Sequence, residues 1–308
     1  MKHKPNAIVV CCTPNWLPYA ACTLKSCVDQ GSSQVADLYV ICMGVTERDR
    51  KSFSAFLTRH RFRATLIAGV LPEKLVKNSQ KRFSAAAFLR LTLNEILAPD
   101  YQRVLYLDSD ILALSSVASL FDIDLGGTPL AAVEDYQSFP GMFGSKRNHA
   151  TAIGLPEGAR YFNSGVLLFD WPQTVARKLL QECVQRILAL DASAKKLGFP
   201  DQDVMNLVFA GEWLRLPRVY NLISIVSDYF PERPVFRHFT MDNKPWHNVW
   251  VLGYGEYRET YRAMLAATPW ESSVAKRVTG IAPIQSLKML LRRADKPTRL
   301  RYLRHLGS

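Results

Sequence analysis

The stretch RVLYLDSDIL (residues 103–112) decides the fold class that this sequence predicts. Residues 104–107 form a short apolar run typical of a buried strand, and two carboxylates, Asp108 and Asp110, follow at its C-terminal end. In open α/β sheets that end is where ligands bind. If the backbone stays extended, a period of two aims both carboxylates the same way, and such a pair suits Mg²⁺ or Mn²⁺. A polar turn that ends a strand is the alternative interpretation of an isolated Asp-x-Asp.

Short apolar runs alternate with helical patterns on both sides of this strand, which predicts an α/β fold with a largely parallel sheet and crossover helices. Strands are expected at residues 8–12, 38–43, 64–68, 104–107, 130–133 and 165–169. Helices are expected at residues 19–28, 47–59, 83–97, 172–190, 201–210 and 254–270. Residues 136–158 are rich in Gly, Ser and Pro, and are expected to form a substrate-facing loop with room for one short helix.

Composition is that of a globular protein of 308 residues, with 48% hydrophobic and 21% charged residues, which excludes wholesale disorder. The net charge of +12 is concentrated at residues 276–308, which hold nine basic residues and one acid. There Ile284, Leu287, Leu291 and Ala294 share one helical stripe, while Lys288, Arg292 and Arg293 project elsewhere. We therefore expect two parts, a domain at 1–275 and a basic amphipathic tail at 276–308.

The cysteine pattern and the hydropathy predict a cytoplasmic protein. None of the six cysteines forms a CxxC pair, and most lie within apolar runs, so buried reduced thiols are expected. The first apolar run, residues 7–12, is too short for a signal-peptide core, and no stretch approaches the roughly 18 apolar residues of a membrane span. A basic amphipathic tail on such a protein favours the anionic inner face of the plasma membrane as its partner.

Three further segments carry candidate functional side chains. Asn163 and Ser164 precede an apolar strand, although an ordinary Asn-Ser-Gly turn explains them equally well. The segment FPDQD (199–203) places two acids at a helix start, where N-capping by Asp201 is the simpler explanation. In HFTMDNKPW (238–246), His238 would complete a mixed N/O ligand set for Mn²⁺, and Lys244 would neutralise a diphosphate on that metal, although lone histidines are more often structural.

Taken in order, these segments resemble glycosyltransferase family 8, the group of glycogenin and of bacterial lipopolysaccharide galactosyl- and glucosyltransferases. The resemblance covers about residues 7–250. It includes VVCCTPNWLPY (9–19) as the opening nucleotide-binding strand and loop, AFLRL (87–91) as an Arg-bearing helix, LYLDSD (105–110) as the Asp-x-Asp motif, NSGVL (163–167), DQD (201–203) and HFTMDNKPW (238–246). Thr13-Pro14 replaces an acidic pair that the family often has, and Met241 stands where a Gly is usual.

The resemblance implies a GT-A fold and transfer of a hexose, galactose or glucose, from a UDP-sugar to a glycan or lipid-linked acceptor, with retained configuration. It implies Mn²⁺, with Mg²⁺ as the alternative, held by Asp108, Asp110 and His238. It assigns the chemistry to Gln202, Asp201, Asp135 and Arg90. It assigns donor binding to Cys12, Thr13, Asn15, Arg90, Asp108, Ser109, Asp110, Asn163, Ser164, Gln202, His238 and Lys244.

The stereochemical course is not fixed by these residues. Retention through two displacements needs a nucleophile on the far face of the sugar, and the side chain aligned there is the poorly nucleophilic amide of Gln202. A dissociative transfer on the same face is therefore the favoured interpretation.

Two other classes remain as alternatives. A haloacid-dehalogenase type phosphatase or phosphotransferase also carries Asp-x-Asp after a strand, but it leaves the segment from Lys244 to Trp246 unexplained. A non-catalytic protein could bind nucleic acid or membrane through residues 276–308, although no nucleic-acid-binding fold is recognisable there. A dinucleotide oxidoreductase is excluded, because CCTPN stands where GxGxxG is required.

Overall fold

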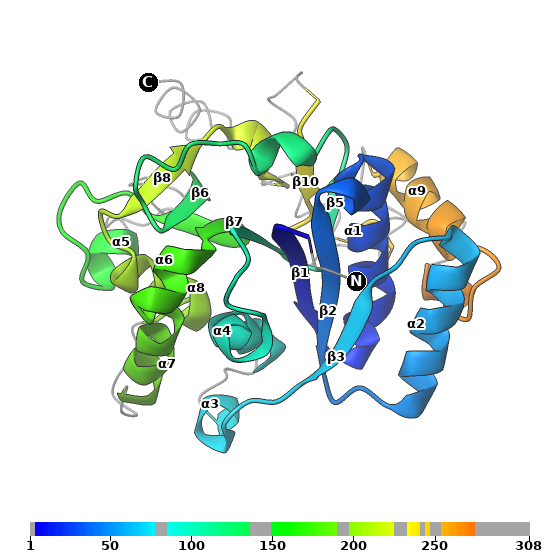
Figure 1. The fold of residues 1–308 in the computed structure, drawn as a ribbon, viewed down its shortest axis with the longest axis horizontal. Helices are drawn as coiled ribbons and strands as arrows, with labels where there is room; N and C mark the ends of the chain where they lie inside the picture. Colours follow the sequence, from blue (N-terminus) through cyan, green and yellow to red (C-terminus); the bar gives the residue numbers. More distant parts are fainter. Residues whose placement is uncertain are drawn as a thin grey trace, which may run out of the picture.

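The computed structural model describes residues 4–77, 85–135, 149–189, 197–224, 233–240, 244–246 and 254–274. Among them, seven strands form one sheet in the order β3-β2-β1-β4-β7-β6-β8, and three short strands form a second sheet in the order β5-β10-β9 (Figure 1). The large sheet consists of β3 (Thr65–Gly69), β2 (Ala36–Met43), β1 (Asn6–Cys12), β4 (Arg103–Leu107), β7 (Phe162–Asp170), β6 (Leu130–Glu134) and β8 (Trp213–Leu216). The small sheet consists of β5 (Ile111–Ala113), β10 (Phe236–His238) and β9 (Leu222–Ile223).

The large sheet is mixed and mostly parallel, as predicted. The strands β3, β2, β1 and β4 run parallel to one another, and β6 is parallel to β8. The strand β7 is antiparallel to both of its neighbours, β4 and β6. As a result, the start of β7 lies beside the end of β4, so that Asn163 and Ser164 come next to Asp108.

Helices cover both faces of the large sheet. Figure 1 shows α1, α2 and α9 on one side and α4, α6, α7 and α8 on the other. The strand β1 shows why, because Ile8 and Val10 pack into one apolar cluster while Ala7 and Val9 pack into the other. The helices are α1 (Leu17–Asp29), α2 (Glu47–His60), α3 (Glu73–Lys77), α4 (Leu93–Ile96), α5 (His149–Ala152), α6 (Trp171–Ala176), α7 (Leu179–Ala189), α8 (Pro200–Val208) and α9 (Gly255–Leu265).

Two predicted helices are interrupted by residues in the left-handed region. Residues 172–190 form α6 and α7 rather than one helix, because Lys178 has a φ of 55° between them. Residues 254–270 are helical only as far as Leu265, and Ala267 also has a φ of 55°. A residue with left-handed backbone angles cannot continue an α-helix. Neither position is a glycine, so the break could not be predicted from the residue type.

The predicted helix at residues 83–97 is also wrong in type. The structure has a 3-10 helix, η3 (Ala85–Thr92), followed by the single turn of α4. The 3-10 segment contains Arg90, whose guanidinium donates to Asp108, directly after β4, and to the carbonyl of Ser164 in β7. The expected short helix within residues 136–158 is confirmed as α5, whereas 136–148 lie outside the described residues.

The strands β5, β8, β9 and β10 were not predicted, because each is only two to four residues long. They matter for the site, since β5 begins directly after Asp110 and pairs with β10, where His238 lies opposite Ile111. The tail at 276–308, and with it the predicted boundary between the two parts, lies outside the described residues. Of the helices that the structure describes, none is both long enough and apolar enough to traverse a lipid bilayer.

Candidate active site

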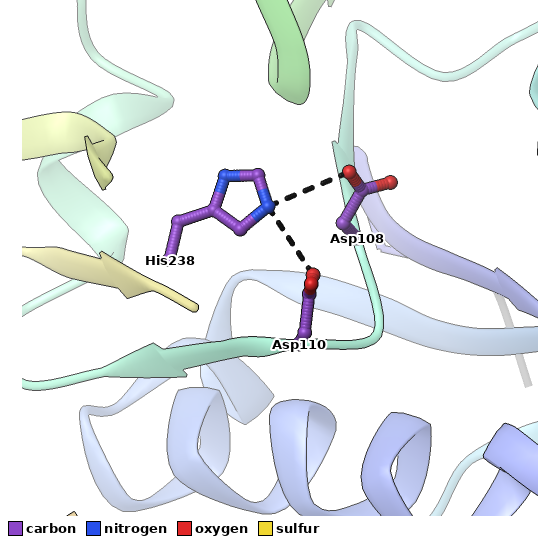
Figure 2. A group of neighbouring side chains, drawn as sticks. All are labelled: Asp108, Asp110 and His238. Carbon is purple, nitrogen blue, oxygen red and sulfur yellow. Dashed lines mark ion pairs between the residues drawn. The ribbon is translucent and has the colours of Figure 1, made fainter. Parts of the chain in front are cut away.

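Two carboxylates and one imidazole converge at the end of β4. The Nε2 atom of His238 lies 3.2 Å from a carboxylate oxygen of Asp110 and 3.6 Å from one of Asp108 (Figure 2). One ligand atom from each of the three residues lies within 4.8 Å of the others. Two hard carboxylate oxygens and an imidazole nitrogen form a donor set that fits a divalent cation such as Mn²⁺. The predicted metal ligands are therefore brought together.

The backbone reason for this convergence differs from the one predicted. Residues 108–110 form a turn between β4 and β5 rather than an extended continuation of β4. The carboxylates meet because this turn bends the chain around His238, as Figure 2 shows, and not because of strand pleating. The backbone N–H of Asp108 donates to the carbonyl of Gly165 at 2.9 Å, and the N–H of Phe239 donates to the carbonyl of Asp110 at 2.9 Å, so both ends of the turn are anchored.

Lys244 lies against the metal ligands rather than apart from them. Its ammonium donates to Asp110 and to the carbonyl of Phe239, and it sits 5.5 Å from the centre of the Trp16 ring. Burial would raise the pKa of Asp110, but the Lys244 ammonium and the His238 imidazole outweigh it, so the pKa of this carboxyl lies well below its usual range. A cation and a ligand carboxylate thus share one buried ion pair.

Arg90 provides the second buried cation of the site. It reaches from η3 and donates to Asp108 at 2.9 Å and to the carbonyl and hydroxyl of Ser164 at 2.7 and 2.9 Å. Its guanidinium lies 4.5 Å from the centre of the Tyr106 ring. Burial would lower the pKa of Arg90, but the nearby acids, Asp108 first among them, outweigh burial and raise it above the usual range. The charge of Arg90 is therefore held permanently beside Asp108.

Asp201 does not act as the helix cap that its sequence position suggests. The helix α8 begins at Pro200, its N-cap is Phe199, and no side chain caps the N-terminus. Asp201 instead lies 3.3 Å from Nε of Arg90. Burial raises the pKa of the Asp201 carboxyl, although Arg90 acts in the opposite direction.

Four of the predicted chemistry and donor-binding residues form two hydrogen-bonded pairs, Gln202 with Ser164 and Asn163 with Asp135. The amide oxygen of Gln202 accepts from the backbone N–H of Ser164 at 2.9 Å and from its hydroxyl at 3.1 Å. The amide nitrogen of Asn163 donates to Asp135 at 2.7 Å. All four side chains are at least 90% buried. The structure therefore brings the start of α8 and the facing ends of β6 and β7 together at the edge of the sheet that carries Asp108.

The family model described as Glycosyl transferase family 8 matches residues 7–249, which include all of the residues above. The chain belongs to glycosyl transferase family 8. The phosphatase alternative is therefore not retained. The order and spacing of the motifs predicted this family membership, and the comparison confirms it.

Named proteins similar to this family 8 chain include two from Escherichia coli (strain K12). Lipopolysaccharide 1,2-glucosyltransferase is 28% identical over 201 residues, which cover 61% of this chain and 56% of that protein. Lipopolysaccharide glucosyltransferase WaaO is 26% identical over 236 residues, which cover 73% of this chain and 67% of that protein. This chain thus matches about half the length of the first of these relatives.

Solved structures confirm the GT-A fold of this family 8 member. An active-site mutant of LgtC is 21% identical, with a TM-score of 0.74, and the alignment covers 87% of this chain and 99% of that chain. LgtC, a galactosyltransferase in complex with donor and acceptor sugar analogues, is 23% identical, with a TM-score of 0.71 and the same coverage. The mixed sheet and its helical layers are therefore a known scaffold.

The predicted nucleotide-binding residues of the family 8 opening loop lie on the same sheet edge. Cys12 is the buried last residue of β1, which runs parallel to β4 with Val10 opposite Leu107. Thr13 is half-buried and precedes the 3-10 turn η1 (Pro14–Trp16), in which Asn15 is exposed. Ser109 is half-buried on the turn between the two metal-ligand carboxylates. Their predicted contacts with a nucleotide remain predictions.

Sequence analysis missed three side chains that hold the family 8 site together. The Tyr106 hydroxyl donates to Asp108 at 2.8 Å, and the two-residue strand period would have placed these side chains on one face. The Tyr161 hydroxyl accepts from the Gln202 amide at 3.0 Å. Asn221 contacts His238, and its only sequence signal is an amide that precedes an apolar run, as Asn163 does.

Proposed function

We propose that this protein is a retaining glycosyltransferase that moves a hexose from a UDP-sugar to a glycan or lipid-linked acceptor. One observation supports the proposal above all. In a family 8 chain, two carboxylates and an imidazole converge within 4.8 Å at the C-terminal end of a parallel strand, with two buried cations beside them. Ligand binding at that edge is the rule for open α/β sheets. Asp108, Asp110 and His238 would hold the metal, with Mn²⁺ proposed and Mg²⁺ as the alternative.

The chemistry requires stabilisation of negative charge on the departing diphosphate. A bound divalent cation would act as a Lewis acid on the diphosphate oxygens. Arg90 stands beside Asp108, and the neighbouring acids hold its charge in spite of burial, so it supplies fixed positive charge without reorganisation. Lys244 neutralises Asp110 in this structure. With that carboxylate engaged by a cation, the Lys244 ammonium would be available to the diphosphate.

A same-face transfer agrees with how Gln202 is held. Its amide oxygen accepts two hydrogen bonds from Ser164, and its amide nitrogen donates to Tyr161. An amide oxygen engaged in this way is a poor nucleophile, and its carboxylate neighbours Asp135 and Asp201 are paired with Asn163 and Arg90. These side chains are therefore proposed to orient the donor sugar rather than to attack it.

The sugar and the acceptor are proposed from the relatives. Two similar proteins are named as lipopolysaccharide glucosyltransferases, and LgtC is named as a galactosyltransferase. Galactose or glucose is therefore the proposed hexose, and a lipopolysaccharide-type glycan is the proposed acceptor.

Calorimetric titration of UDP into the metal-stripped protein tests this function. UDP is expected to bind in the presence of Mn²⁺ and at least about tenfold more weakly without it, because the diphosphate then meets Asp108 and Asp110 unscreened. GDP and ADP serve as controls for base recognition, since Thr13-Pro14 replaces the family's acidic pair. Hydrolysis of UDP-galactose and UDP-glucose then identifies the sugar. Binding of UDP that is weak and indifferent to metal would contradict the proposal.

We further propose that residues 276–308 bring the enzyme to an anionic membrane surface. Nine basic residues stand there against one acid, and each Lys or Arg near such a surface contributes ~1 kcal/mol. Removal of 276–308 is expected to abolish sedimentation with phosphatidylglycerol vesicles while donor hydrolysis persists. A full-length variant with Arg292, Arg293 and Lys296 changed to Gln is the matched control for charge. Unchanged sedimentation of both variants would contradict a membrane role.

A further inference from the structure

A buried chain of amide hydrogen bonds connects the candidate metal ligands to the donor-sugar pocket. The Nδ1 atom of His238 lies 2.9 Å from the Oδ1 atom of Asn221, and the Nδ2 atom of Asn221 donates to Oδ1 of Asn163 at 2.8 Å. Asn163 Oδ1 also accepts from the backbone N–H of Gly165 at 3.0 Å, and Asn163 Nδ2 donates to Asp135 at 2.7 Å. His238 and Asn221 are 3% and 2% exposed, so water does not compete for these bonds.

The direction of these hydrogen bonds is fixed by two groups whose roles cannot change, the backbone N–H of Gly165 and the carboxylate of Asp135. A backbone N–H only donates, so the Asn163 atom that faces Gly165 must be the oxygen, and a carboxylate only accepts, so the atom that faces Asp135 must be the nitrogen. Both ends of Asn163 therefore demand the same amide orientation. Asn221 must then turn its nitrogen toward Asn163 Oδ1, because the flipped amide would oppose two oxygens 2.8 Å apart.

This orientation of the Asn221 amide determines which nitrogen of the His238 imidazole carries a proton. With its nitrogen committed to Asn163, Asn221 presents its oxygen to His238, and the Nδ1 atom facing that oxygen must carry a proton. A neutral imidazole protonated at Nδ1 would have its lone pair on Nε2, the atom that lies 3.2 Å from Asp110 and 3.6 Å from Asp108 and that would face a cation held by these carboxylates. We propose that Asn221 is a positioning residue that commits His238 to this tautomer, so that Nε2 is the metal-ligating atom, and that couples metal binding to the Asn163–Asp135 side of the donor pocket.

The inference rests on the proposed metal site. It deepens that site because Asn221 is the described side chain that contacts both the imidazole and the donor pocket. A buried hydrogen-bond partner of a metal-bound imidazole sets ring orientation and basicity, and its loss costs about 10- to 100-fold in metal affinity.

Mn²⁺ affinity without nucleotide, measured by electron paramagnetic resonance of free Mn²⁺, provides the test. Asn221→Leu removes both hydrogen bonds at similar volume, and it is expected to weaken Mn²⁺ binding by about 10- to 100-fold. Asn221→Asp keeps an acceptor for His238 but cannot donate to Asn163, so it is expected to retain Mn²⁺ binding while raising the KM for the UDP-sugar. Retention by the aspartate variant and loss in the leucine variant would separate positioning from a general loss of structure.

Two controls separate the possible failures. Asn6→Leu removes a buried amide that donates to the carbonyl of Val35 at the far end of β1, so it is expected to lower thermal stability without changing Mn²⁺ affinity. If Asn221→Leu does not fold, Asn221→Ala replaces it. If Asp110→Ala abolishes Mn²⁺ binding while Asn221→Leu binds as the wild type does, the inference is overturned. If Asp110→Ala binds Mn²⁺ normally, the metal site itself is wrong, and the proposed function fails with it.

Discussion

Replacement of Asp110 by alanine is expected to abolish Mn²⁺-dependent binding of UDP and to lower sugar transfer by at least about a thousandfold. The variant removes one of three converging ligands, and metal stabilisation of the departing charge contributes several kcal/mol, of which every 1.36 kcal/mol is about a tenfold change in rate. Calorimetry of UDP with Mn²⁺ and a transfer assay measure the two effects. The exposed Asp122→Ala is the matched control and is expected to behave as the wild type.

The same substitution also leaves the Lys244 ammonium buried without its carboxylate, and breaking a buried ion pair costs about 3–5 kcal/mol. A double variant, Asp110→Ala with Lys244→Met, separates the two consequences. It is expected to recover most of the lost thermal stability, because the uncompensated charge is gone, while Mn²⁺ binding stays absent. Mn²⁺ binding that returned together with stability would show that Asp110 supports the fold and is no ligand.

Gly165→Ala is expected to have the second largest effect, because no room exists for a methyl group. A Cβ atom at Gly165 would lie 2.2 Å from Cε1 and 2.7 Å from Nδ1 of His238. The ring must therefore shift, and the shift breaks its contact with Asn221 and moves Nε2 away from the carboxylates. Overpacking of this kind costs about 1–3 kcal/mol of stability, and a displacement of ~1 Å costs about a hundredfold in activity.

Thermal melting and Mn²⁺ titration of the Gly165 variant test this expectation together. Gly255→Ala is the matched control, since nothing lies within 4 Å of a Cβ there and Gly255 is the first residue of α9. It is expected to be neutral or slightly stabilising, because alanine loses less backbone entropy than glycine on folding. Wild-type Mn²⁺ affinity in Gly165→Ala would mean that His238 does not ligate the metal from its present position.

Local sequence patterns predicted much of the fold, because many single strands and helices have a recognisable hydrophobic pattern. The strands β1 and β4 consist mainly of continuous apolar runs that are buried on both faces, so they can be predicted without any tertiary information. The break at Lys178 was not predictable in this way, because a non-glycine residue in the left-handed region leaves no mark in the sequence. The short strands β9 and β10 were missed because two or three residues show no periodicity.

The residues of the candidate site were also predictable only in part. Asp108 and Asp110 were predicted from an apolar strand followed by acids, and His238 and Lys244 were predicted from the chemistry of the segment HFTMDNKPW (238–246). Arg90 came from the resemblance to the family. The condition of an extended backbone after β4 is not met, because a turn separates β4 from β5 and carries the two carboxylates. The prediction that Asp201 caps α8 was also wrong, because Phe199 is the N-cap of that helix, and the Asp201 carboxylate lies 3.3 Å from Nε of Arg90.

What the sequence by itself determined is the inventory of chemistry: two acids after a buried strand, an imidazole and two cations, in the order of glycosyl transferase family 8. Only the tertiary structure decided which of these groups are joined by hydrogen bonds. His238 and Asn221 are 17 residues apart, and Asn221 and Asn163 are 58 apart, yet they are joined by hydrogen bonds of 2.8–2.9 Å. Hydrogen bonds depend on distances of a few ångströms and on donor direction, and both are set by packing of strands that are remote in the chain.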